Sequence, residues 1–378
     1  MRNFVKKENN WVLVIIGFFL LIYAFSLTFV MVDGDHVESM AYHMFGRNPV
    51  IQKPFSAYHS MMDIVMSVFP ARENTLAVAS LLISSTATII MIVAIIWLVF
   101  KWVEQINLTI KKKWLIGFVI LLASPEFFFL GLVYNPTVIA MSLVIVSHLL
   151  LRGVVKHLIS STWSKQRLSL HIILSAIIFG LGVSCRWNVI IYGGIIFFDL
   201  VVYTIQADNR LFWSKDSIQK DLKYLPVFVA WGVIAIIFSY GAIWLSGYDL
   251  QGILNQLGTV WLENENFNYR TILVLTPLLT PAAAVLSIAG FLTLLRSRSP
   301  LILTVLLSFL TVIPWLTEGA PKLFVTSFPA FIFCVAIGFN TLWYKVNSRL
   351  RPYIRSGLVI ILLAPWFIGI NIIGDDST

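Results

Sequence analysis

The stretch "TLAVASLLISSTATIIMIVAIIWLVF", residues 75–100, runs for 26 residues without a charged side chain. A helix needs about 20 predominantly apolar residues to cross the hydrocarbon core of a bilayer. This stretch is therefore long enough to span a membrane, and similar runs recur along the chain. We predict 11 spans, near residues 11–32, 75–100, 114–130, 135–151, 168–185, 188–206, 225–245, 271–295, 300–316, 323–343 and 356–373.

The composition indicates the same class of protein. Hydrophobic residues make up 58% of the 378 residues, charged residues only 12%, and the mean hydropathy is +0.87. A soluble domain of this composition would have too few polar side chains to cover its surface. We therefore expect an all-α polytopic membrane protein with about 11 transmembrane helices, forming one transmembrane domain over residues 1–378. Its sizeable outer loops would be 33–74 and 246–270, with no separate soluble domain.

The N-terminal segment and the cysteines add two expectations. The basic start "MRNFVKKENN" precedes an apolar run that is too long for a signal peptide and has no small-residue cleavage pattern, so we expect a retained first span. Cys185 and Cys334 both lie in apolar runs and form no metal motif or disulfide framework. We expect both cysteines to be core residues.

The distribution of Lys and Arg predicts the orientation in the membrane. With the N-terminus in the cytoplasm, 21 of the 27 basic residues fall in cytoplasmic segments, among them Lys101, Arg152 and Lys156. Cytoplasmic loops of membrane proteins carry this excess, which also accounts for the net charge of +9 without a nucleic-acid partner. Trp102 and Trp114, near span ends, fit an interfacial tryptophan belt. Of the 18 acidic residues, 12 fall on the opposite side, and chemistry on that face is one cause that would explain the bias.

The first outer loop begins with acids. In "FVMVDGDHVESMAYHMFGRNP", residues 29–49, Asp33 and Asp35 flank Gly34 directly after the first span. Glycine permits backbone geometries in which both carboxylates converge on one point. Two such carboxylates suit a divalent cation such as Mg²⁺ or Mn²⁺. Alternatively, one of them is a general base, or both merely hydrate the loop.

Apolar residues in 36–46 recur at helical spacing, so we expect an amphipathic helix lying in the membrane plane. Its polar face would carry Glu38 and His43. His59 follows in the same loop, and we favour polar loop residues over metal ligands for the histidines because no zinc spacing is evident. These three residues are secondary candidates for the site.

Four further charged residues fall on the predicted outer side. Glu126 lies in "SPEFFFLGLVYNP", where a carboxylate among aromatic residues needs a partner. Arg186, Lys322 and, less strongly, Arg270 are cations that would suit a lipid-linked phosphate. The alternatives are a hydrated loop acid for Glu126 and snorkelling to headgroups for the cations.

Together these motifs resemble the GT-C superfamily of integral-membrane glycosyltransferases, which use polyprenyl-phosphate sugars as donors. In that superfamily an Asp follows the first span, and an in-plane helix with an alanine and then a glycine comes next; Asp33, Ala41 and Gly46 match. The usual second acid is displaced, since Gly34 precedes Asp35. The looser matches are "SPEFFFLGLVYNPTVIA" with Glu126, "GLGVSCRWNVIIY" with Arg186, and "APKLFVTSFPAF" with Lys322 and Pro329.

The resemblance implies a hexosyl- or pentosyltransferase of mannosyl-, arabinosyl- or glucosyltransferase type, active in glycan biosynthesis at the cell envelope. A glycan, a lipid or a protein would be the acceptor, on the periplasmic, extracellular or lumenal face. Asp33 or Asp35 would act as base, with Glu126 as a second acid. Arg186, Lys322 and Arg270 would bind the donor phosphate, and Asp33 and Asp35 are the candidate ligands of a divalent cation.

Three other classes compete with this interpretation. One is a purely structural membrane subunit, which would leave the acids on the outer side unexplained. A lipid-linked glycan polymerase or ligase would be expected to carry an arginine-rich outer loop, whereas 246–270 holds one basic residue, Arg270. A transporter or flippase of lipid-linked sugars would carry charges within the membrane. Asp199, His148 and His171, inside predicted spans, are the hints in that direction.

Overall fold

The computed structural model describes residues 73–106, 108, 113–124, 136–207, 224–245, 280–311 and 326–368, together with Gly17. Within these residues the chain is all-helical and has no strand. The expected all-α class is therefore confirmed for the described part of the chain.

Each predicted span after the first coincides with a helix over at least part of its length. The helices are α5 (Glu73–Gln105), α6 (Lys113–Ala123), α8 (Pro136–Ile159), α9 (Lys165–Cys185), α10 (Tyr192–Ala207), α12 (Leu225–Leu245), α15 (Pro281–Ser297), α16 (Leu301–Leu310), α17 (Phe328–Tyr344) and α18 (Arg351–Ile368). A short 3₁₀ helix, η1 (Trp187–Ile191), lies between α9 and α10.

Helices α5, α8 and α9, and the continuous helical segment formed by η1 and α10, each contain a stretch that is long and apolar enough to cross a membrane. The segments are Leu82–Gln105, Thr137–Ile159, Lys165–Cys185 and Val189–Gln206. They identify a membrane protein, whereas the number of 11 spans stays a prediction. The first predicted span, 11–32, lies outside the described residues except for Gly17.

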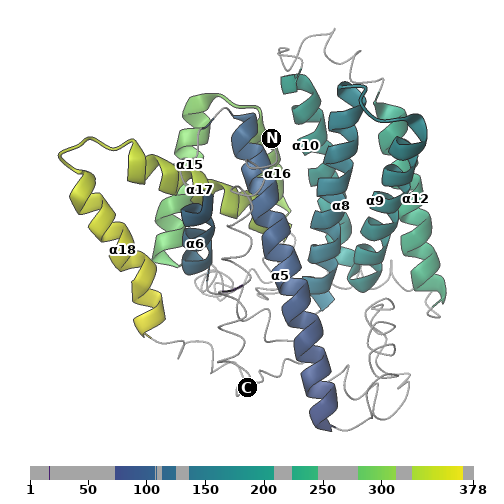
Figure 1. Ribbon diagram of the computed structural model, residues 1–378, viewed down its shortest axis with the longest axis horizontal. Helices are drawn as coiled ribbons and strands as arrows, with labels where there is room; N and C mark the ends of the chain where they lie inside the picture. Colours follow the sequence, from purple (N-terminus) through teal and green to yellow (C-terminus); the bar gives the residue numbers. More distant parts are fainter. Residues whose placement is uncertain are drawn as a thin grey trace, which may run out of the picture.

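The helices form two groups joined by α5, as Figure 1 shows. On one side α8, α9, α10 and α12 pack together, and on the other side α15, α16 and α17 pack together with α6 and α18. The long helix α5 contacts both α8 and α17, and α10 contacts α16. Side chains of α5 can therefore meet side chains from both halves of the bundle.

Helices α8 and α9 run antiparallel in one register. The Ser147 hydroxyl donates to the carbonyl of Ser175 at 2.8 Å, and the Ser175 hydroxyl donates to the carbonyl of Ser147 at 2.9 Å. Gly182, seven residues after Ser175, packs against Ala140, seven residues before Ser147; the Ala140 carbonyl oxygen would lie 3.0 Å from a Cβ added at Gly182. Reciprocal hydroxyl bonds and a glycine contact are the devices that join helices in a membrane.

Among the described helices, α15 and α17 cross with their backbones in direct contact. A Cβ added at Gly290 would lie 1.8 Å from the carbonyl oxygen of Cys334, and one at Gly338 would lie 1.8 Å from that of Leu286. Two glycines on facing helices therefore let the two backbones touch. Cys334 and Cys185 are both buried, which confirms the expectation that they are core residues.

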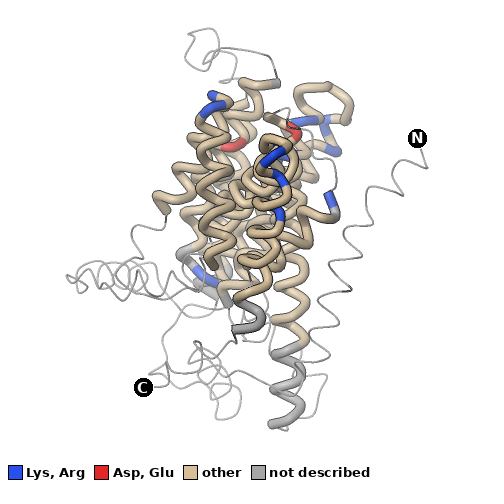
Figure 2. The backbone as a smooth tube through the Cα atoms, turned by 90° about the vertical axis from the view of Figure 1, so that its left-hand side faces the viewer, with Lys and Arg blue, Asp and Glu red and all other residues tan. Residues whose placement is uncertain are grey.

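Charged side chains are distributed unevenly along the bundle. Figure 2 shows the Lys and Arg of the described chain gathered toward one end, with little blue at the other. Contacts identify this end: Lys113 at the start of α6 pairs with Glu104 at 3.4 Å, and Gln206 near the end of α10 donates to Ser299 at 3.5 Å. We call it the basic end.

Candidate functional site

Arg186 is the predicted site residue that the structure describes. It caps α9, in extended backbone (φ −154°, ψ 111°), where that helix gives way to η1. Its N–H donates to the carbonyl of Gly182 at 3.1 Å, and its own carbonyl accepts the N–H of Val189 at 3.3 Å. Because α9 starts at Lys165 on the basic end and is 21 residues long, Arg186 lies about 30 Å away, at the opposite end of the bundle. We call this the Arg186 end.

The other predicted site residues lie outside the described residues. They are Asp33, Asp35, Glu38, His43, His59, Glu126, Arg270 and Lys322. The in-plane helix expected over 36–46 lies outside them as well.

The described helix ends that flank most of these segments can still be placed. The C-terminus of α5 lies at the basic end, so this 33-residue helix runs toward the Arg186 end and begins beyond it, after the segment with Asp33 and Asp35. Helix α6 ends and α8 begins there too, on either side of the segment with Glu126. The Thr280 hydroxyl, which caps α15, donates to the carbonyl of Ala123 at 2.6 Å, so the segment with Arg270 reaches the bundle at the same end.

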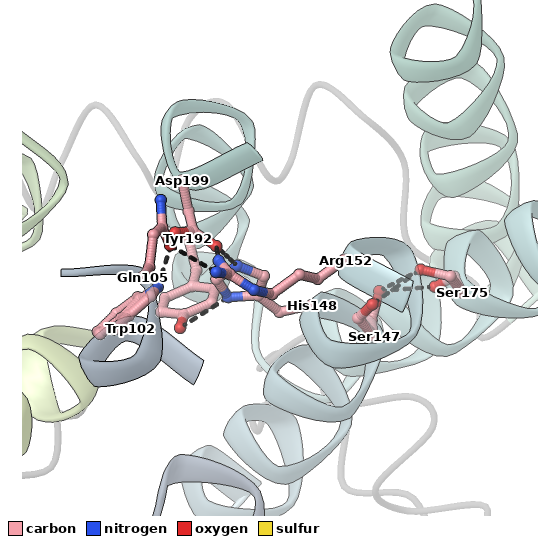
Figure 3. A network of polar contacts seen from close by, with 8 residues as sticks. All are labelled: Trp102, Gln105, Ser147, His148, Arg152, Ser175, Tyr192 and Asp199. Atoms are coloured by element: carbon pink, nitrogen blue, oxygen red, sulfur yellow. Dashed lines mark hydrogen bonds and ion pairs between the residues drawn. The ribbon is translucent and has the colours of Figure 1, made fainter. Parts of the chain in front are cut away.

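The most polar cluster among the described residues lies elsewhere, inside the bundle. Asp199 of α10 is fully buried, and three side chains from α5 and α8 converge on its carboxylate (Figure 3). Trp102 Nε1 donates to Oδ1 at 2.6 Å, and His148 Nε2 lies 2.8 Å from Oδ2. Arg152 Nη1 donates to the same Oδ2 and forms an ion pair with it. We call Asp199 with these three partners the Asp199 network.

Gln105, Tyr203 and Tyr192 contact the partners of Asp199 and hold them in place. Arg152 Nη2 donates to Gln105 Oε1, and the guanidinium of Arg152 lies over the Tyr203 ring, 4.5 Å from its centroid. Since a carboxylate only accepts, His148 Nε2 carries a proton, and in the neutral ring Nδ1 is then free to accept from the Tyr192 hydroxyl at 3.3 Å. The Asp199 carboxylate therefore has both oxygens bonded and its charge paired.

This geometry fits a structural role better than a catalytic one. A buried charge that lacks a partner destabilises a protein strongly, whereas a paired one is close to neutral. Here every partner comes from a different helix turn, so the network ties α5, α8 and α10 together. In the described chain the Asp199 network is thus a structural link between helices, with its carboxylate bonded three times by protein groups.

The sequence indicated only part of this network. Asp199 and His148 were recognisable as ionisable residues inside predicted spans, but no pattern paired them. Arg152, counted with the cytoplasmic segments, lies within α8, which continues past it to Ile159, and its side chain is only 5% exposed. The interfacial belt predicted for Trp102 is wrong, because this indole is fully buried and bonded to Asp199.

The remaining candidates give no metal centre in the described chain. No three His, Cys, Asp or Glu side chains come together among the described residues. His171, a further ionisable residue inside a span, lies apart from Asp199 and donates from Nδ1 to the carbonyl of Arg167 at 2.8 Å.

Comparison with known proteins identifies no related protein or structure. No family model matches the chain, and neither a curated protein nor a solved structure is significantly similar to it.

Proposed function

We propose that this chain is a membrane-embedded glycosyltransferase. It would move a sugar from a polyprenyl-phosphate donor to an acceptor hydroxyl on the non-cytoplasmic face, with the N-terminus in the cytoplasm. The observation that carries the proposal is the separation of charges along the bundle: Lys and Arg gather at the basic end, while Arg186 lies at the other.

Two features of the Arg186 end support this assignment. The positive-inside rule places the basic end in the cytoplasm, so the Arg186 end faces outward. The helix ends that border the segments with Glu126 and Arg270 lie at this same end, and α5, which follows the segment with Asp33 and Asp35, begins beyond it on the same side. Acids and a cation from distant parts of the sequence can therefore serve one site at one membrane face.

The chemistry we propose is a single displacement with inversion. The acceptor oxygen attacks the anomeric carbon and forms the new glycosidic bond, while the bond from that carbon to the phosphate oxygen breaks. The acceptor proton passes to the carboxylate of Asp33 or Asp35. Arg186, Lys322 and Arg270 stabilise the negative charge on the departing polyprenyl phosphate. A divalent cation held by Asp33 and Asp35 would supply further charge stabilisation there.

The test replaces the two aspartates separately by asparagine, in protein that inserts at normal levels. Removal of a general base lowers the rate by about 10²- to 10⁴-fold, so Asp33→Asn or Asp35→Asn should lose transfer from a radiolabelled polyprenyl-phosphate sugar. Asp249→Asn is the matched control, because it removes the same charge from another predicted outer loop. Full transfer by both variants would contradict the proposal.

Arg186 provides a second test of the same site. Arg186→Gln should raise the KM for the donor, while Arg186→Lys should retain part of the phosphate contact. If both variants bind and turn over donor like the wild type, Arg186 is a headgroup anchor and has no role in the reaction.

A second candidate function is favoured by the Asp199 network. Ionisable residues buried within spans line the routes of transporters, so a flippase of lipid-linked sugars would use Asp199. Asp199→Asn would then stop lipid-sugar movement in liposomes that contain no acceptor and form no transfer product. If Asp199→Asn lowers only the free energy of unfolding, the network is structural and the transferase proposal is favoured.

A further inference from the structure

A cavity of about 530 Å³ opens between α5 and α8 at the basic end. One side of its lining is apolar, formed by Trp97 and by Val146, Leu149 and Leu150. Trp97 is 46% exposed, so this side faces outward from the bundle, where lipid chains would lie. The other side is polar and holds Lys101, Gln105, Arg152 and Lys156, with Glu104 beside them.

The cations of this cavity differ in how far they are already paired. Arg152 is committed to Asp199 and Gln105, and Lys101 pairs with Glu104 at 2.9 Å. Lys156 is exposed and forms no ion pair with any described residue. The cavity therefore offers one uncommitted ammonium group, and a second one whose carboxylate partner is itself half-exposed.

Gln105 adds a donor that the protein does not use. Its Oε1 accepts from Arg152, which fixes the amide orientation, and its Nε2 is a buried nitrogen without a hydrogen-bond partner. A buried donor that stays unpaired destabilises the protein, because it has lost its bonds to water. An acceptor oxygen in the cavity would remove that cost after a small movement of the side chain.

We infer that this cavity binds the phosphate headgroup of an anionic phospholipid, with one acyl chain along Trp97, Leu149 and Leu150. The ammonium groups of Lys101 and Lys156 would contact the phosphate oxygens, and Gln105 Nε2 would donate to one of them. Basic pockets between transmembrane helices on the cytoplasmic side bind anionic headgroups in this way.

The lipid assignment rests on the cavity having two chemically different sides. A soluble phosphate would use the lysines but leave the apolar side exposed to water, whereas a phospholipid covers both. The floor of the cavity also has room, because a Cβ added at Gly153 would meet no atom within 4 Å. The site lies at the end of the bundle away from Arg186, so it is independent of the proposed donor site.

The experiment is native mass spectrometry of the full chain in detergent, titrated with phosphatidylglycerol and, separately, with phosphatidylcholine. We expect saturable binding of phosphatidylglycerol and weak binding of phosphatidylcholine. Lys101→Gln with Lys156→Gln should lower the phosphatidylglycerol affinity about 30-fold, since each lysine near an anionic headgroup contributes about fivefold. Lys165→Gln with Lys345→Gln, two exposed lysines at the start of α9 and just after α17, is the control with equal loss of charge and should bind like the wild type.

Two further variants do not depend on losing a contact. Glu104→Gln releases Lys101 and Lys113, so it should strengthen phosphatidylglycerol binding, a gain that misfolding cannot produce. Gly153→Leu favours the helix but fills the cavity, so it should abolish the saturable adduct, whereas Gly194→Leu, also with open space around it, should not.

Three outcomes would overturn the inference. The first is equal affinity for the wild type and the Lys101, Lys156 double variant. The second is equal loss of affinity in the Lys165, Lys345 control, which would mean that net charge alone attracts the lipid. The third is full displacement of phosphatidylglycerol by millimolar glycerol 3-phosphate, which would identify a soluble phosphate as the ligand.

Discussion

Two helix interfaces of this bundle are held together by different interactions. One is the crossing of α15 and α17, and the other is the junction of α5, α8 and α10. At the crossing, Gly290 and Gly338 bring two backbones into contact. At the junction, Asp199 binds Trp102, His148 and Arg152 through buried polar bonds. Lipid chains are as apolar as leucine, so burial alone does not drive helices together, and close packing and polar bonds must do so. This chain therefore uses close glycine packing at one interface and buried polar bonds at another.

We expect the largest loss of stability from a substitution at the glycine crossing. Gly290→Val would place a Cβ 1.8 Å from the carbonyl oxygen of Cys334, so α15 and α17 would have to separate. We expect a loss of about 4 kcal/mol or more in the free energy of unfolding, at the extreme of single substitutions. Titration of the unfolding transition in SDS would measure it. Gly232→Val, where an added Cβ meets nothing within 4 Å, should change stability little, and equal losses would contradict the close crossing.

The second largest loss is expected when the buried ion pair of Arg152 and Asp199 is broken. Arg152→Met leaves the Asp199 carboxylate buried without its cation, and removal of one partner of a buried pair costs about 3–5 kcal/mol. The same unfolding titration measures this loss.

The double variant sharpens this second test. Arg152→Met with Asp199→Leu removes both charges, so it should recover much of the stability that Arg152→Met loses, because no uncompensated charge remains. If the double variant is less stable than both single variants, the ion pair itself stabilises the fold and does more than compensate two buried charges.

The two interfaces also differ in how far the sequence predicted them. Apolar runs predicted the helices, because their length follows from the thickness of a bilayer. Asp199 and His148 stood out as ionisable residues in apolar surroundings. Trp102 and Arg152 did not, since their position near a predicted span end is equally typical of interfacial residues. The Gly290 and Gly338 contact also had no signal, because which glycine faces which helix depends on the crossing angle of helices far apart in sequence.

For the candidate site, the sequence predicted at which end of the bundle a residue lies, but it did not predict which residues contact one another. The charge bias along the chain assigned Arg186 to the side opposite the basic loops, and the structure gives it that end of α9. The distances among Asp33, Asp35, Glu126 and Arg186 cannot follow from spacing, since they belong to segments separated by whole helices. A periodic pattern specifies the face of one helix, whereas a site depends on how several helices meet.

A smaller effect distinguishes the polar bonds that carry charge from those that do not. Ser175 accepts from Trp231 Nε1 at 3.1 Å and also bonds Ser147, so it joins α8, α9 and α12 without an ion. Ser175→Ala leaves the indole N–H of Trp231 buried without this acceptor and should cost about 1 kcal/mol. Ser142→Ala is the control, because the Ser142 hydroxyl donates only to a carbonyl of its own helix. A cost for Ser175→Ala near that of Arg152→Met would mean that neutral bonds hold this half of the bundle as firmly as the buried charge does.

The smallest effect concerns the same kind of charge pair outside the core. Lys101 and Glu104 pair at 2.9 Å with both side chains more than a third exposed, so water screens the attraction that burial preserves between Arg152 and Asp199. Lys101→Gln should therefore change the free energy of unfolding by about 0.5 kcal/mol or less, the usual range for an exposed pair. Salt should remove that difference while leaving the effect of Arg152→Met almost unchanged, because a buried pair is screened far less. Lys101→Gln could instead destabilise the fold as much as Arg152→Met does. That result would contradict the prediction, because burial would then not determine how much an ion pair contributes to stability.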